Sequence, residues 1–181
     1  MQKRIEKKLE EANKLIFVKR YHEAEQLLDD LLETPEAKHE MLVHLRRVEL
    51  AAMLKKLEKA RAHYHKQLRA GVDMGINELC VALVEQHGEM VQPTESINTF
   101  QDIIKRHGAS AAAYYGIGYG MEQMNNHDRA VFNYEQALNV DPGFYVAYFG
   151  MSQIYYQMGD ERSEEHTSEL QSHSFISYAV F

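Results

Sequence analysis

The sequence predicts an all-α fold built from short helices that pair and stack along the chain. Three observations carry this prediction. Apolar residues recur with the three-to-four spacing of one helix face, as at Ile5, Leu9 and Ala12, and no stretch alternates long enough for a strand. The three prolines, at positions 35, 93 and 142, fall between the segments with this spacing. Finally, similar segments return at a nearly constant interval, which is typical of a repeat architecture.

Composition places the chain among globular proteins and weighs against some functions. The 181 residues are 45% hydrophobic and 26% charged, and the formal net charge is −7. This acidic balance disfavours a nucleic-acid binder, which normally presents a clustered positive face. The first twenty residues are locally basic, and we interpret them as the solvated face of a helix.

We expect a soluble, cytoplasmic protein. No apolar run approaches the length of a membrane span, and the charged segment after Met1 does not resemble a signal peptide. The single cysteine, Cys80, excludes an internal disulfide and stands in the apolar run LCVALV, so it is expected to be a buried thiol.

The repeat becomes visible when the chain is aligned on one small residue in the second helix of each pair. These small residues stand 36, 36 and 34 positions apart, at Ala24, Ala60, Ser96 and Ala130. Four positions later come large residues, Leu28, Tyr64, Phe100 and Tyr134. Seven positions later come Leu31, Gln67, Ile103 and Ala137, of which only Gln67 is not apolar.

This spacing has a physical reason. Residues four and seven apart lie on one face of a helix, so a small residue and two apolar ones make a seam along it. The small residue lets a neighbouring helix approach closely, and the large one fills the space behind it. A single helix pair cannot bury such a seam, so the pairs must stack. A plain helical bundle would also show this periodicity, but it would not require the regular spacing.

The pattern is clearest near the carboxyl end of the chain, where the sequence resembles the tetratricopeptide repeat (TPR) family. The stretch AAAYYGIGYGMEQMNNHDRAVFNYEQALNVDP, residues 111–142, places residues that match the family pattern at Tyr114, Ile117, Gly118, Met121, Ala130, Tyr134, Ala137 and Pro142. The next stretch, FYVAYFGMSQIYYQMGD, does so at Tyr148, Met151, Ser152 and Tyr155, followed by a Gly159–Asp160 turn. The resemblance covers about residues 5–160 and is weaker in the first three units.

The resemblance implies an α-solenoid of stacked helix-turn-helix repeats in a right-handed superhelix, truncated in its fifth repeat. We expect a repeat domain over residues 1–161. Its units are expected at about residues 5–40, 41–76, 77–110, 111–144 and, in part, 145–161.

The last twenty residues do not fit this pattern. A second helix for the fifth unit would place Glu164, Ser168 and Gln171 at packing positions, and a carboxylate buried there without a partner would be costly. RSEEHTSELQS resembles an in-frame translation of a common sequencing-library adapter, and ISYAVF matches its continuation after a gap of index length. We therefore interpret residues 162–181 as a non-native tail and expect the gene product to continue differently after Glu161.

No catalytic or metal-binding pattern stands out. His63 and His65 are two apart, so a helix points them to different faces, and no zinc-site spacing occurs. The glycines of GIGYG do not match a nucleotide-binding loop, and no strand precedes them. Cys80 and His87 could share a helix face but have no orienting third group. We expect no enzyme activity, no cofactor and no metal.

What remains is a surface. In the TPR family the first helix of each unit lines a concave groove, and this resemblance implies groove positions in the fourth and fifth units. The predicted partner-binding residues are Tyr115, Tyr119, Gln123, Phe149, Gln153 and Tyr156. The implied groove is aromatic and has no Lys or Arg in these two units, whereas chaperone-binding members use basic residues to clamp a C-terminal carboxylate. We therefore do not expect that clamp, and the lack of basic residues also disfavours RNA.

The sequence thus favours a protein–protein interaction scaffold that binds a peptide or partner protein through an aromatic concave groove. A different interpretation is that these aromatic residues pack against a missing downstream helix. A second functional hypothesis is that the chain is the interaction or regulatory part of a larger enzyme or signalling protein, whose active domain lies beyond the truncation.

Overall fold

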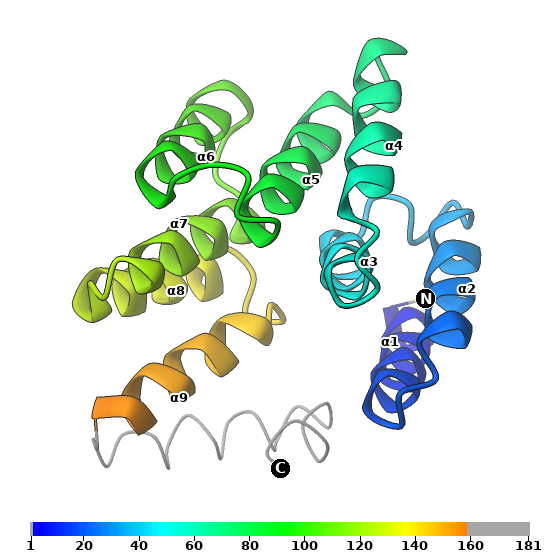
Figure 1. The fold of residues 1–181 in the computed structure, drawn as a ribbon, viewed down its shortest axis with the longest axis horizontal. Helices are drawn as coiled ribbons and strands as arrows, with labels where there is room; N and C mark the ends of the chain where they lie inside the picture. Colours follow the sequence, from blue (N-terminus) through cyan, green and yellow to red (C-terminus); the bar gives the residue numbers. More distant parts are fainter. Residues whose placement is uncertain (1, 159–181) are drawn as a thin grey trace. The chain divides into compact units, whose positions relative to one another are not determined.

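The computed structural model describes residues 2–158. Within this range the chain forms nine α-helices and no strand, which confirms the predicted all-α class (Figure 1). The helices are α1 (Gln2–Phe17), α2 (Tyr21–Leu32), α3 (Met41–Met53), α4 (Leu57–Arg69), α5 (Met74–His87), α6 (Pro93–His107), α7 (Ala111–Gln123), α8 (His127–Val140) and α9 (Val146–Met158). The tail at residues 162–181, with the packing positions considered on it, lies outside the described residues.

The helices belong to two compact units that divide between Gly88 and Glu89. The first unit contains α1 to α5, in which each helix packs against a helix that precedes or follows it in the chain. The second contains α6 to α9, with α7 packed against α6, α8 and α9. The residues expected to form the third repeat, 77–110, are therefore shared between the two units.

The turns after α1, α3, α5 and α7 share one backbone feature, a residue with positive φ. Lys19, Lys55, Glu89 and Asn125 have φ angles of 60°, 57°, 51° and 56°. They lie 36, 34 and 36 positions apart, so the turn returns with the period of the helices. None of them is glycine, although the left-handed region costs a residue with a side chain about 1 kcal/mol or more. The hydrogen bonds of the turn must therefore hold the conformation in place.

After α1, α3 and α7, these hydrogen bonds follow the Schellman pattern of helix ends. After α1, the Lys19 N–H donates to the Ile16 carbonyl over 3.0 Å and the Arg20 N–H donates to the Leu15 carbonyl over 2.8 Å. The same two bonds recur with Lys55 and Lys56 as donors after α3, and with Asn125 and Asn126 as donors after α7. Each pair satisfies carbonyls that the helix end would leave without partners, and it reverses the chain toward the next helix.

In the first unit, most of the aligned seam positions lie in the core. Ala24 and Leu28 are fully buried on α2, and Tyr64 is buried on α4. Ala60 and Gln67, which the alignment places beside Tyr64, remain partly exposed. The small residue at position 60 therefore does not lie in a fully closed helix contact, because the polar face of α4 leaves this part of the helix in contact with water.

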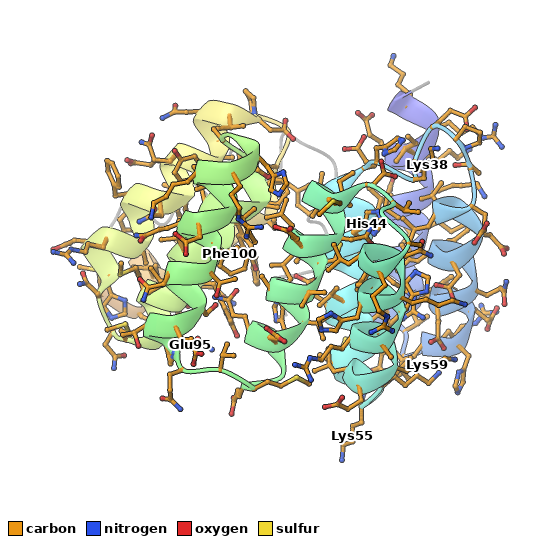
Figure 2. All side chains as sticks on the ribbon, turned by 90° about the horizontal axis from the view of Figure 1, so that it is seen from above. Lys38, His44, Lys55, Lys59, Glu95 and Phe100 are labelled. Atoms are coloured by element: carbon orange, nitrogen blue, oxygen red, sulfur yellow. The ribbon has the colours of Figure 1, made fainter. Side chains whose placement is uncertain are left out.

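A buried polar cluster in the first unit centres on His44. Its Nε2 lies 2.9 Å from the Lys38 carbonyl and its Nδ1 lies 3.4 Å from the Tyr64 hydroxyl. Figure 2 shows His44 on α3 and Lys38 on the segment that leads into it. A carbonyl can only accept, so Nε2 carries the proton and Nδ1 accepts from Tyr64. Burial lowers the pKa of His44, so the neutral ring is the form that fits this cluster.

Ion pairs connect α2 with the α3 hairpin. The Arg47 guanidinium binds Asp29 through Nε over 2.5 Å and Glu25 through Nη2 over 3.1 Å. Lys56, in the turn after α3, binds the other oxygen of Glu25 over 2.6 Å. Because Glu25 and Arg47 are both largely shielded from water, these pairs are screened less than pairs on an open surface. They favour one register of α2 against α3.

The turn geometry makes a testable prediction about Lys55, which Figure 2 shows pointing away from the hairpin at the tip of its turn. Lys55→Gly should raise the free energy of unfolding by about 0.5–1 kcal/mol, since glycine adopts positive φ without steric cost. The matched control is Lys59→Gly, on the exposed face of α4, which should lower it by about 1 kcal/mol. Urea denaturation of both variants measures the difference, and a loss of stability in Lys55→Gly would contradict the turn assignment.

Two histidines shielded from water, the buried His44 and the partly exposed His87, make a prediction about pH. Burial lowers the pKa of both His44 and His87 below the ordinary value near 6.5, so the unfolded chain binds protons that the folded chain does not. Their contribution to stability is complete above about pH 6.5 and is lost as the pH falls toward the folded-state values. Each should add a slope of up to about 1.4 kcal/mol per pH unit below pH 6.5.

His44→Gln, which removes one of these groups, should make the decline shallower. Urea denaturation between pH 7.5 and 5.5 measures the slope in both proteins. Equal slopes in the parent chain and in His44→Gln would show that His44 is not held neutral.

Candidate functional site

The second unit is organised around the ring of Tyr134 on α8. A Cβ placed on Gly118 of α7 would lie 2.7 Å from two ring carbons, and one placed on Gly150 of α9 would lie 2.7 Å from two others. Real Cβ atoms do not approach a ring this closely, so both positions require glycine. Tyr134 is 1% exposed. Its ring thus fills the space that the two missing side chains leave between α7 and α9.

The same arrangement recurs one repeat earlier. Phe100 of α6 is fully buried, and a Cβ on Gly116 of α7 would lie 2.4 Å from its ring. Phe100 and Gly116 are 16 positions apart, as are Tyr134 and Gly150. The aromatic ring of one second helix therefore meets a glycine on the first helix of the following repeat. This register positions α7 and α9 in equivalent ways.

The hydroxyl of Tyr134 fixes the position of a carboxylate. It donates a hydrogen bond of 2.7 Å to Oε2 of Glu122, one turn beyond Gly118 on α7. The same hydroxyl lies 3.1 Å from the Cβ position of Gly150. Burial raises the pKa of Tyr134 well above its usual range, so the phenol stays protonated and remains a donor. Glu122 is accordingly held at the place where α7 meets α9.

Tyr115, predicted to contact a partner, is largely buried inside the unit. Its ring centroid lies 5.6 Å from that of Tyr134 and 5.9 Å from that of Phe144, which approaches edge-on. Phe144 precedes α9 and is 1% exposed. Only 8% of Tyr115 is exposed, so its main contacts are with the chain itself. Tyr115 thus packs α7 against the segment that leads into α9.

The other predicted residues of α7 lie closer to the surface. Tyr119 is partly exposed, and its ring stacks on Tyr115 with centroids 6.5 Å apart and planes inclined by 15°. Gln123, four positions further, is exposed. The buried Tyr115 therefore holds the ring of Tyr119 in a defined orientation, and the stripe becomes progressively more exposed toward the end of α7.

The three predicted residues of α9 form a second stripe. Phe149 is partly exposed, Gln153 is exposed and Tyr156 is 81% exposed. Their spacing of four and three residues places them on one face of the helix. Because α7 and α9 contact each other in the second unit, the two stripes lie on neighbouring helices.

The site also contains residues that sequence reasoning did not single out as binding residues. Glu122 precedes Gln123 on α7, but its hydrogen bond with Tyr134 could not be read from the sequence. Phe144 covers Tyr115 from a segment outside the helices, so a pattern of helical positions does not include it. The recurrence of glycine at 116 and 150, 34 positions apart, was the signal that could have revealed the aromatic contacts.

The single cysteine, Cys80, lies in the first unit and is buried. Burial raises the pKa of the Cys80 thiol and outweighs the hydrogen bond from Tyr64, which lowers it, so the thiolate form is disfavoured. Among residues 2–158, no group of three or more His, Cys, Asp or Glu side chains could hold a metal ion. In the same range no helix has both the length and the apolar character needed to cross a membrane.

Comparison with known proteins agrees with this architecture. Residues 111–144, which include α7 and α8, match the tetratricopeptide repeat family, as the sequence predicted. A crystal structure of MamA is similar over 90% of this chain and 94% of its own, with 17% identity and a TM-score of 0.52. The structure of MamA residues 41 to the end, from Desulfovibrio magneticus RS-1, is similar over 94% of this chain and 94% of its own, with 13% identity and a TM-score of 0.52.

A third solved structure, YrrB, is described as a TPR protein with an unusual peptide-binding site. It covers 92% of this chain and 84% of its own, with 18% identity and a TM-score of 0.50. No curated protein sequence matches this chain. At these identities the likenesses establish the fold, an all-α solenoid of helical repeats.

The contact between Gly118 and Tyr134 makes a testable prediction. In an ordinary helix interior Gly→Ala stabilises by about 1 kcal/mol. Gly118→Ala should instead lower the free energy of unfolding by about 2–3 kcal/mol, since the new methyl group collides with the Tyr134 ring.

In a Tyr134→Leu background the same substitution should cost at least about 1 kcal/mol less, because the ring is gone. Denaturant unfolding of the four proteins measures this coupling. Additive effects of the two substitutions would show that they do not touch.

Proposed function

Because residues 111–144 form a tetratricopeptide repeat within an array of helix pairs, we propose that the chain is a protein-interaction scaffold that binds a peptide or partner segment along α7 and α9. The observation that carries this proposal is the stripe on α9, where Tyr156 is 81% exposed beside Gln153 and Phe149. Exposed aromatic side chains in a row are typical of protein interfaces, where they bury a large area at low entropic cost.

The chemistry of these helices suits a mainly apolar partner segment. Neither α7 nor α9 carries a Lys or Arg, so a carboxylate clamp has no basic side chain to form it. The rings of Tyr119, Phe149 and Tyr156 can take apolar side chains between them. The amides of Gln123 and Gln153 offer donors and acceptors for the backbone of the bound segment.

The proposed partner is a protein rather than a nucleic acid, since the helices lack the cations that phosphates require. YrrB, described as having a peptide-binding site, supports the compatibility of this fold with peptide binding. We propose a binding role rather than a catalytic one, because the aromatic stripe supplies contact area and no activated nucleophile.

The test begins with selection of a displayed random peptide library on the immobilised full chain. The best peptide is then synthesised with a fluorescent label and titrated by anisotropy. Tyr156→Ser should weaken binding by about tenfold or more, since an aromatic anchor contributes about 2 kcal/mol at an interface. Because its side chain is so exposed, the fold should be unchanged in circular dichroism.

The matched control is Phe132→Ser on α8, which removes another exposed aromatic side chain of the same unit. It should leave the affinity unchanged. Equal losses in the two variants, or no loss in Tyr156→Ser, would refute binding along α7 and α9.

A further inference from the structure

Helices α7 and α9 carry a single charged side chain between them, that of Glu122 on α7. The two helices contain no other Asp or Glu and no Lys or Arg. Among the described residues, no ion pair involves Glu122, and its side chain is only partly exposed. A carboxylate in this setting loses part of its hydration without gaining a cation in return, which is a favourable starting point for pairing with a partner.

The position of this carboxylate is fixed from within the unit. Tyr134 is buried and donates to Oε2 of Glu122 over 2.7 Å, and the Tyr134 hydroxyl is itself close to Gly150 of α9. One oxygen thus anchors the side chain at the α7–α9 junction, and the other remains as an acceptor. A preoriented acceptor loses little conformational entropy when a ligand binds, so the bond can contribute to affinity.

The neighbours of Glu122 fit a cationic side chain with an apolar stem. Tyr119 lies one turn earlier on α7, and its ring orientation is set by the stack on Tyr115. A Lys or Arg that reaches Glu122 can lay its methylene groups along this ring, and its charge is attracted to the ring face. The exposed amide of Gln123 can accept a further hydrogen bond from the same group.

We infer that the segment bound along α7 and α9 carries a Lys or Arg beside its apolar residues, and that this cation pairs with Glu122. The inference rests on the proposed function and adds the partner's charge to it. The net charge of −7 for the whole chain acts in the same direction, since it attracts a cationic segment during approach. The occupant is thus a basic and apolar peptide segment of a partner protein.

The test uses the full chain and the peptides selected on it. The selected peptides should be enriched in Lys or Arg next to apolar residues. Glu122→Gln keeps an oxygen that accepts from Tyr134 but removes the charge, and it should weaken the best peptide by about 5- to 30-fold in anisotropy titrations. The matched control, Glu135→Gln on the exposed face of α8, removes the same charge elsewhere in the unit and should have no effect.

A change on the peptide side keeps the test independent of the stability of the variant. Replacing the peptide's Lys by norleucine, or its Arg by citrulline, should weaken binding to the parent chain by a similar factor. The same replacement should have no further effect on Glu122→Gln, because the pair is already broken. Added NaCl should weaken the parent complex more steeply than the Glu122→Gln complex.

The outcomes separate this inference from the function it rests on. Peptides that need Tyr156 but lack basic residues, or that bind Glu122→Gln and the parent equally, would overturn the inference alone. Failure to select any peptide that needs Tyr156 would overturn both. A rise in the mass of the chain on light scattering, weakened by Tyr156→Ser, would identify a second copy of the chain as the occupant and overturn the inference.

Discussion

A large aromatic ring seated against glycine α-carbons holds the second unit together. Tyr134 has van der Waals contact with Gly118 and Gly150 on its two sides, which is possible because neither presents a Cβ. Burying a ring of this size contributes about 2–3 kcal/mol, and the close backbone approach adds dispersion contacts along two sides of the ring. Both α7 and α9 pack against this one side chain, which therefore helps to position the two helices that carry the exposed stripes.

This packing also decides how the surface is charged. The ring places its hydroxyl at the junction of α7 and α9, and the buried phenol, kept protonated, holds Glu122 there. The contact that stabilises the fold therefore also orients the one charged group on the two helices. The structural role and the proposed binding role therefore concern neighbouring atoms of one cluster, and the stacked Tyr115 and Tyr119 continue this cluster toward the surface.

Periodicity predicted the helices and most of the core, because burial repeats wherever helices stack. The alignment picked out Phe100 and Tyr134 from their spacing alone, and both rings are buried in the structure. Exposure on the first helices was less predictable. Tyr115 stands at a position that lines the groove in the repeat pattern, but Phe144 covers it from the loop before α9. Such a contact depends on tertiary structure that a pattern of helical positions does not include.

The turns were hidden for a different reason. A helix end with positive φ is usually marked by glycine, whereas this chain places Lys19, Lys55 and Asn125 there. The division of the chain between Gly88 and Glu89 had no signal either. The connection at this division, between α5 and α6, is longer than the turn between α3 and α4. Helix α6 begins four positions after the positive-φ residue Glu89, whereas α4 begins two positions after Lys55.

The separation of 16 positions on either side of Tyr134 has an evolutionary consequence. Three residues at this separation occupy a fixed space, so their sizes are constrained together and not one by one. In the first unit the corresponding buried residues are Ala12, Leu28 and His44. There the central leucine is smaller than Tyr134, and the two flanking residues are larger than the glycines of the second unit. Homologous chains should therefore show negative covariation in volume between the central position and its two partners, with neutral drift proceeding through compensating pairs.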